Sequence, residues 1–307
     1  MKYKNITLIF VKIIITTGIF FLLKEKVQLS ELLPTLEKVS ISGIITASSI
    51  LILSTILTGL RWYYVLRFCR IQTSLKNAIF QIYKGFSVSQ IMPSNIGGDI
   101  YRILAIRKNV EKYRDATALV MLDRILGMLS MLLCSMMMTP FFINIVTKAS
   151  IRKFIFLLVL TVVILILCLY FLNRFITKKI PILHQLMHYG AHLFNTKNFP
   201  KLIFTTLSIT VLYVFSVAIL AKDIGIMIDF KIFLFVIPLI TILSVMPISF
   251  AGWGVREGLM VLFLGFFGVS SEQSLILSIL FGVINLIAAI PGALMFLTSA
   301  NLSRQTT

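Results

Sequence analysis

The sequence has few charged residues and few polar stretches. Charged residues make up 13% of its 307 residues and hydrophobic residues 58%, and the mean hydropathy is +0.99. Because soluble globular domains are about one-quarter charged, this composition excludes a soluble protein and indicates an integral membrane protein. A spanning helix takes about 20 mostly apolar residues. We therefore expect no room for a separate soluble catalytic domain.

Acidic residues and cysteines are also scarce. Only 11 residues are Asp or Glu, against 29 Lys and Arg, which gives a formal charge of +18. The basic residues cluster between hydrophobic runs, as topology signals and contacts to anionic lipids do, so we expect no nucleic-acid partner. Cys69, Cys134 and Cys168 are scattered in or near apolar segments. No disulfide framework or metal cluster follows from them.

Six continuous apolar runs predict full transmembrane helices, at about 6–23, 41–66, 117–146, 154–172, 202–221 and 274–298. The first run continues into Lys24-Glu25-Lys26 without a small-residue cleavage site, which predicts a retained span rather than a signal peptide. Basic residues concentrate at 67–76, 107–114 and 174–201, whereas Lys148, Arg152 and Lys153 fall on the other side. The balance predicts that both termini are cytoplasmic.

A short amphipathic helix is predicted at about 181–195. His184, His188 and His192 share one face of it, and apolar side chains share the other, as in a helix that lies at the membrane interface. The i, i+4, i+8 spacing would also suit a metal or a pH sensor. No carboxylate or cysteine lies nearby to complete a metal shell, so we favour a solvated helix face and expect no metal.

Two further apolar stretches, around 77–106 and 231–268, are broken by proline, glycine and charge, and they resemble each other. Residues 91–102 (IMPSNIGGDIYR) align without a gap with residues 245–256 (VMPISFAGWGVR). The coinciding pairs are Met92 with Met246, Pro93 with Pro247, Gly98 with Gly252, and Arg102 with Arg256. Proline ends a helix, and glycine, here Gly97, Gly98, Gly252 and Gly254, permits turns that other residues resist. Each motif therefore predicts a helix break.

The two broken stretches are predicted to point in opposite directions. By the span count the first is entered from the cytoplasm and the second, after five spans, from outside, provided that each returns to the side it left. Paired broken segments of this kind indicate a transporter's binding site. We predict a single all-α membrane domain over 1–307, with about six full transmembrane helices and two Gly/Pro-broken re-entrant hairpins. These hairpins form an inverted repeat with halves at about 41–146 and 201–299.

Ionisable residues in the apolar stretches gather at these motifs. Because a charge buried in hydrocarbon costs several kcal/mol, such residues pair with one another or line a polar pathway. The candidates are Asp99, Arg102, Asp123, Arg124, Arg256 and Glu257. For Asp123 and Arg124 a structural ion pair and a functional role are equally supported. A functional role is favoured for Arg102, Arg256 and Glu257, because the arginine recurs in both motifs.

Arg61-Trp62, at the end of the second predicted span, is interpreted as an ordinary interfacial anchor. The same dipeptide also belongs to a set of motifs found in order along the chain. The others are Pro93 through Gly97-Gly98-Asp99 to Arg102, Asp123-Arg124-Ile125-Leu126-Gly127, and Pro247 through Gly252-Trp253-Gly254-Val255-Arg256-Glu257-Gly258.

With these motifs the sequence resembles the lysylphosphatidylglycerol synthase transmembrane-region family of flippase-like membrane proteins, over nearly its whole length. In the best-understood members this region precedes a soluble aminoacyl-tRNA-dependent transferase and moves the aminoacylated lipid between leaflets. The transferase is missing from this sequence, so the resemblance implies lipid translocation and not lipid synthesis. Stand-alone relatives are linked with envelope glycan or polyprenyl-lipid pathways, which makes a polyprenyl-phosphate-linked lipid an alternative to a phospholipid.

The leading hypothesis is a flippase or scramblase of the bacterial or archaeal cell (inner) membrane. Arg102 and Arg256 would bind the lipid phosphate, and Asp99, Asp123 and Glu257 would orient the arginines or contact a cationic or hydroxylated headgroup. No P-loop is present, so we expect no nucleotide cofactor.

The alternative is a non-transporting partner that binds or presents a lipid to an envelope glycosyltransferase or lipid-modifying enzyme. Catalysis by the chain itself is not expected, since no metal-ligand cluster or activated nucleophile accompanies Asp99 and Glu257. The sequence sets no oligomeric state.

Overall fold

The computed structural model of the chain describes residues 29–92, 96–143, 181–245 and 254–304, and all regular structure in these ranges is helical. Four of the described helices are long and apolar enough to cross a membrane: α3 (Ile41–Phe68), α6 (Tyr113–Ile143), α9 (Phe199–Asp223) and α12 (Ser271–Arg304). The shortest has 25 residues, or about 37 Å at 1.5 Å per residue, against a hydrocarbon core of about 30 Å.

The prediction of an all-helical, multi-pass integral membrane protein is thus confirmed. Four of the six predicted spans correspond to these helices. The spans predicted at 6–23 and 154–172 lie outside the described residues.

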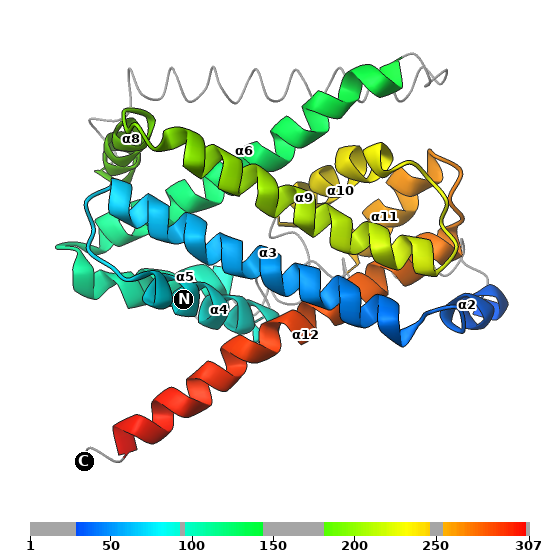
Figure 1. Cartoon of the computed structure of the whole chain (residues 1–307), viewed down its shortest axis with the longest axis horizontal. Coiled ribbons are helices and arrows are strands. Elements are labelled where there is room, and N and C mark those ends of the chain that lie inside the picture. Colours follow the sequence, from blue (N-terminus) through cyan, green and yellow to red (C-terminus); the bar gives the residue numbers. More distant parts are fainter. Residues whose placement is uncertain (1–28, 93–95, 144–180, 246–253, 305–307) are drawn as a thin grey trace, which may run out of the picture.

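Helices α3 and α9 run side by side through the middle of the molecule (Figure 1). Small and hydroxylated residues lie on their buried faces, which lets the backbones approach closely; the Ser54 hydroxyl donates to the Ile209 carbonyl at 3.3 Å. At one end the Asp223 carboxylate accepts hydrogen bonds from the backbone N–H and the hydroxyl of Ser40, at 2.7 and 2.8 Å. The short helix α2 (Leu29–Leu36) precedes this contact.

The first broken motif lies between α4 (Leu75–Ile91) and α5 (Ile96–Ile106), which pack against each other. The backbone N–H of Gly98 donates to the Ser89 hydroxyl at 3.1 Å, and a Cβ atom on Gly98 would overlap the Gly85 carbonyl oxygen. This close approach requires glycine. Pro93 lies outside the described residues.

The second broken motif lies between α10 (Phe230–Val245) and α11 (Val255–Gly265). Gly254 caps α11 with a φ of +84°, a value that glycine adopts without strain. Pro247 and Gly252 lie outside the described residues. In Figure 1 the α4–α5 pair connects to the rest of the chain at the end where α3 finishes, and the α10–α11 pair connects at the opposite end, where α9 finishes.

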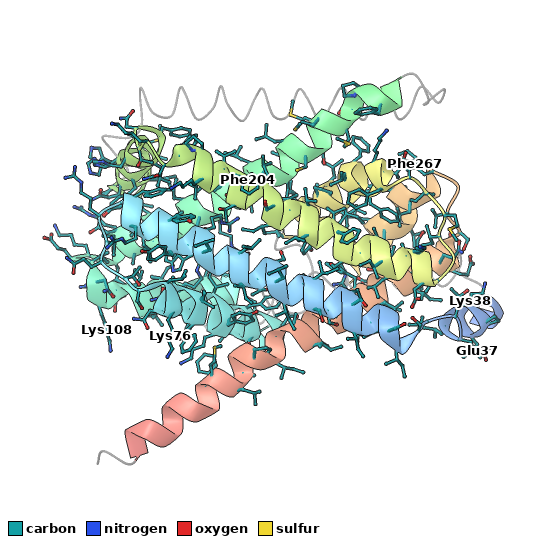
Figure 2. All side chains as sticks on the ribbon, in the orientation of Figure 1. Glu37, Lys38, Lys76, Lys108, Phe204 and Phe267 are labelled. Atoms are coloured by element: carbon teal, nitrogen blue, oxygen red, sulfur yellow. The ribbon has the colours of Figure 1, made fainter. Side chains whose placement is uncertain are left out.

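Basic residues concentrate at the end where α3 finishes and α6 begins, which also carries the 3-10 helix η1 (Arg107–Asn109). Figure 2 shows Lys76 and Lys108 there and Glu37 and Lys38 at the opposite end. The basic end carries Arg67, Arg70, Lys76, Arg107, Lys108, Lys112, Arg114, Lys197 and Lys201 against Glu111 and Asp115. The opposite end carries Lys38, Lys222 and Lys231 against Glu37, Asp223, Asp229 and Glu272. Such an asymmetry distinguishes the two sides of a membrane protein.

Helix α8 (Pro181–Phe194) covers nearly the range of the predicted interfacial helix and packs against α6. Leu186 and Leu193 are its buried residues, and the rings of His188 and His192 meet edge to face with centroids 4.8 Å apart. In the described part of the chain, no three His, Cys, Asp or Glu side chains gather as a metal site would require.

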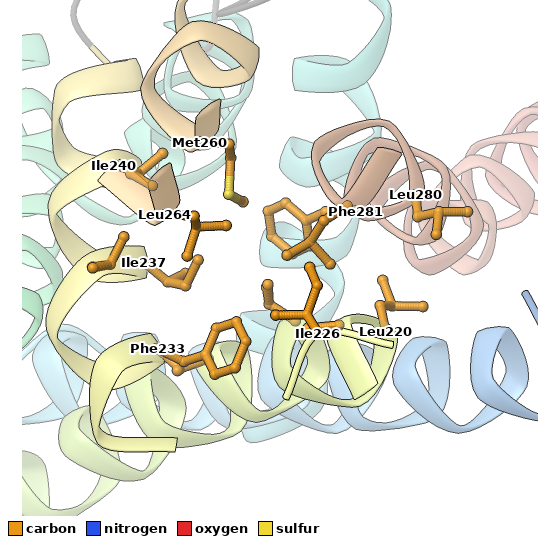
Figure 3. Packing of buried hydrophobic residues seen from close by; sticks show 14 of the residues in the cluster. Leu220, Ile226, Phe233, Ile237, Ile240, Met260, Leu264, Leu280 and Phe281 are labelled. Atoms are coloured by element: carbon orange, nitrogen blue, oxygen red, sulfur yellow. The ribbon is translucent and has the colours of Figure 1, made fainter. Parts of the chain in front are cut away.

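Two hydrophobic clusters fill the interior. One joins α9, α10, α11 and α12, where Phe233, Ile237, Met260, Leu264 and Phe281 converge (Figure 3). The other surrounds Trp62 and Leu119 and includes residues of α3, α4, α6 and α8. Apolar side chains also cover the outer surface, such as Phe204, which is 74% exposed (Figure 2). Exposed apolar side chains on long apolar helices are those that face lipid.

Candidate functional site

Three adjoining cavities lie between the two hydrophobic clusters, with volumes of about 260, 280 and 180 Å³. We call them the Arg256 cavity, the central cavity and the Arg102 cavity. Phe86 and Arg124 line all three. The Arg256 cavity is lined by residues from both broken pairs, including Gln90 of α4 and Met260 of α11. The two broken pairs therefore contribute side chains to the same set of adjoining cavities.

Asp123, on α6, is the centre of a buried ion network. Its carboxylate accepts from Nε of Arg61 at 2.8 Å and from Nη2 of Arg102 at 2.8 Å, and the Asp123 side chain is only 1% exposed. The guanidinium of Arg102 also covers the ring of Trp62, with Cζ 4.3 Å from the ring centroid, and Trp62 in turn donates to Gln81. One carboxylate thus binds two guanidinium groups, from Arg61 on α3 and Arg102 on α5. The Nε atom of Arg102 is buried and has no hydrogen-bond partner among the described residues.

The position of Arg61 corrects its interpretation as an interfacial anchor. Its side chain is buried and faces Asp123 rather than the headgroup region. Its charge is matched inside the protein instead.

Arg124, the next residue on α6, belongs to a second ion pair. Its Nε lies 2.8 Å from Oδ2 of Asp99 on α5. Successive helical residues point about 100° apart, so Asp123 and Arg124 face different partners. Both members of this pair are partly accessible, since Arg124 is 34% and Asp99 21% exposed. The Arg124–Asp99 pair is therefore open to competition in a way that the Asp123 network is not.

Arg256 and Glu257 form the charged cluster of the second motif. Nη2 of Arg256 lies 2.7 Å from Oε1 of Glu257, and Nε of Arg256 donates to the Ser278 hydroxyl at 3.1 Å. The other oxygen of Glu257 accepts from the backbone N–H of Gly254 at 2.6 Å. Glu257 is fully buried, and its charge is balanced by Arg256 and by the N-terminus of α11.

The structure brings the predicted site residues together in a specific way. Arg124 and Arg256 line the same cavity, whereas Arg102, Asp99 and Asp123 line the adjoining Arg102 cavity. The backbone N–H groups of Gly98 and Gly254 already have acceptors, Ser89 and Glu257. Side-chain guanidinium groups, rather than these backbone N–H groups, are thus what the cavities offer to an anion.

Several polar residues of the site were not singled out from the sequence. Tyr213 of α9, Thr241 of α10 and Asn285 of α12 line both the Arg256 cavity and the central cavity. Asn285 is an amide side chain in the apolar middle of α12, and this isolation is the signal that could have identified it. Tyr213 and Thr241 stand on helices with other hydroxyl residues, which give no such signal.

Comparisons with known proteins identify the family to which the chain belongs. The family model described as lysylphosphatidylglycerol synthase TM region matches residues 9–292. That range includes both broken motifs and every charged residue of the cavities. No curated protein matches the chain. With most of its length matched by the family model, the chain belongs to the lysylphosphatidylglycerol synthase TM region family.

Proposed function

We propose that the chain moves a phosphate-bearing lipid between the leaflets of its membrane, as a flippase or scramblase. One observation carries the proposal: Arg124 of α6 and Arg256 of α11 line a single cavity whose other walls are apolar or neutral and polar. Membership of the family supports a lipid-related function in the membrane.

The charge balance of the cavities favours a bound anion. The arginines that line them or support them are Arg61, Arg102, Arg124 and Arg256, and the matching carboxylates are Asp99, Asp123 and Glu257. Four cations against three anions leave one formal positive charge. Arginine binds phosphate with two parallel hydrogen bonds, so one phosphate diester would neutralise the site.

The depth of the site suits translocation. Arg124 lies eleven residues after Tyr113, or about 16 Å along the 31-residue helix α6, which would place it inside a hydrocarbon core about 30 Å thick. A headgroup held there has left one interface and has not reached the other. The apolar wall formed by Ile237, Ile240, Met260 and Phe281 gives the adjoining acyl or prenyl chain a compatible surface.

The layout proposed for transport is an inverted repeat with six full spans. The α4–α5 pair would open from the basic end and the α10–α11 pair from the other, so that each side reaches the cavities in turn. The basic end would face the cytoplasm of a bacterial or archaeal cell, with both termini on that side. Transport would be downhill or coupled to an ion gradient, with no chemical change to the lipid.

Reconstitution into liposomes tests the proposal. A phosphatidylglycerol with a fluorescent acyl chain reports leaflet exchange through the fraction that an external quencher reaches. We expect Arg124→Gln combined with Arg256→Gln to reduce exchange at least about tenfold, because a charge-assisted phosphate contact is worth about 1.5–3 kcal/mol. Arg107→Gln, at the basic end, is the matched control and should retain exchange.

Exchange that survives the double substitution would overturn the mechanism. A wild-type protein that binds the lipid without exchanging it would overturn transport altogether. That outcome would favour a non-transporting partner that presents lipid to an envelope enzyme.

A further inference from the structure

The scarcity of carboxylates limits which headgroup the cavities can hold. The chain has 11 Asp and Glu residues. None of them lies at 93–95 or 246–253, the parts of the two motifs outside the described residues. Glu37, Glu111, Asp115, Asp223, Asp229 and Glu272 lie at the two ends of the helices, and Glu25 and Glu31 precede α3. Away from these two ends, Asp99, Asp123 and Glu257 remain as the carboxylates of the broken motifs and of the interior of α6.

Each of these three carboxylates is already matched by arginine. Asp123 holds Arg61 and Arg102, Asp99 holds Arg124, and Glu257 holds Arg256. Glu257 and Asp123 are buried and spend both oxygens on protein donors. A lysyl or other ammonium group in the Arg256 cavity would meet Arg124 and Arg256, and none of the described residues that line this cavity is a carboxylate to offset them. Like charges brought together in a partly desolvated site cost several kcal/mol.

Neutral hydrogen-bonding groups are present instead. Asn285 donates through Nδ2 to the Phe281 carbonyl at 2.7 Å, so its amide oxygen remains to accept a hydrogen bond. Gln90 and Tyr213 line the same cavity and offer an amide and a phenol. Groups of this kind bind hydroxyls of glycerol or sugar well, and they do not compensate an added positive charge.

We propose that the lipid carried by this chain has an anionic phosphate with an uncharged, hydroxylated headgroup, and that aminoacylated, cationic headgroups are rejected. This inference rests on the proposed function. It replaces the expectation that Asp99, Asp123 or Glu257 would contact a cationic headgroup, because the structure assigns those carboxylates to arginines.

Parallel exchange assays on the reconstituted full chain test the inference. Phosphatidylglycerol and lysylphosphatidylglycerol, each with the same fluorescent acyl chain, are compared in vesicles of the same neutral lipid. We expect phosphatidylglycerol to exchange at least about tenfold faster. Equal or faster exchange of the lysylated lipid would overturn the inference and leave the proposed function intact, whereas exchange of neither lipid would overturn both.

A substitution in the cavity provides a second readout. Gln90→Glu is nearly isosteric and adds a carboxylate to the Arg256 cavity, so we expect it to shift the exchange ratio toward lysylphosphatidylglycerol. Gln72→Glu, in the connection between α3 and α4, adds the same charge away from the cavities and should leave the ratio unchanged. A ratio that moves equally in both variants, or in neither, would overturn recognition by charge in this cavity.

Discussion

Nε of Arg124 lies 2.8 Å from Oδ2 of Asp99, and this ion pair joins α6 to α5 where the cavities adjoin. Because both side chains are partly exposed, a lipid phosphate that binds Arg124 competes with Asp99 for the same guanidinium. Under the proposed function, substrate binding would remove this one contact between α5 and α6. Asp99 would keep its pair with Arg102, at 3.9 Å, and Arg102 its pair with Asp123 on α6.

Removing the competitor should strengthen binding. We expect Asp99→Asn to bind phosphatidylglycerol about two- to fivefold more tightly, since a partly exposed ion pair is worth about 0.5–1 kcal/mol. Titration of the purified protein with the lipid in detergent, followed by native mass spectrometry, measures the change. Arg124→Gln is the matched variant and should weaken binding. Weaker binding by both variants would show that Asp99 positions Arg124 rather than competing for it.

Asp123 should matter more for folding than its neighbour. In Asp123→Asn the buried guanidinium of Arg61 loses the carboxylate that it faces, and that of Arg102 keeps only Asp99, at 3.9 Å. Breaking such a buried network costs about 3–5 kcal/mol. Arg124→Gln removes a partly exposed pair, which should cost less than about 1 kcal/mol. Thermal unfolding followed by size-exclusion chromatography in detergent compares them. Similar melting temperatures would contradict the role assigned to the Asp123 network.

The contact of Gly98 with α4 should be sensitive to a single methyl group. A Cβ atom there would overlap the Gly85 carbonyl oxygen and the Ser89 hydroxyl, so Gly98→Ala should cost about 1–3 kcal/mol. The control is Gly265→Ala at the end of α11, where a Cβ would meet nothing within 4 Å. The same unfolding assay measures both. If Gly98→Ala is as stable as the control, the close packing of α4 and α5 is wrong.

Cys69, which follows α3, should be chemically inert in the folded protein. Burial raises the pKa of its thiol from 9.0 to about 12, because the thiolate would lose its hydration. At pH 8 the thiolate fraction is then about a thousandfold below that of a thiol of pKa 9.0, and the thiolate becomes the major form only above about pH 12. Iodoacetamide labelling of a variant with Cys134 and Cys168 replaced by alanine measures this.

The exposed control for that experiment is Lys108→Cys in the same background, which should label readily. Rapid labelling of Cys69 below pH 9 would contradict its buried position. Complete labelling of Cys69 after denaturation would show that the protection comes from the fold.

The long apolar helices were predictable because their pattern is local. α3, α6, α9 and α12 begin and end close to the predicted bounds, since about 20 consecutive apolar residues specify a span without knowledge of its neighbours. The partners of the charged residues were not predictable in the same way. Arg61 and Asp123 are 62 positions apart and meet only because α3 and α6 pack at that level.

The site depends on the same distinction. The gathering of Asp99, Arg102, Asp123 and Arg124 could be inferred from the cost of buried charge. The sequence could not show which arginine shares a cavity with Arg256. Arg102 and Arg124 lie on different helices, and only the packing of these helices orients the two side chains. Tyr213 and Asn285 reach the cavities for the same non-local reason.

The hydrogen bonds from Ser40 to Asp223 tie the start of α3 to the end of α9, at the end opposite the basic residues. Because these two long helices also pack along their length, they cannot separate at that end without breaking the Ser40–Asp223 hydrogen bonds. A rearrangement that exposes the cavities while α3 and α9 stay joined would have to move the other helices that line them, such as α4, α6 and α11, relative to this pair. Ser40→Ala would remove the hydrogen bonds of the Ser40 hydroxyl to Asp223. It would therefore alter the range of this movement without changing any charged residue of the site.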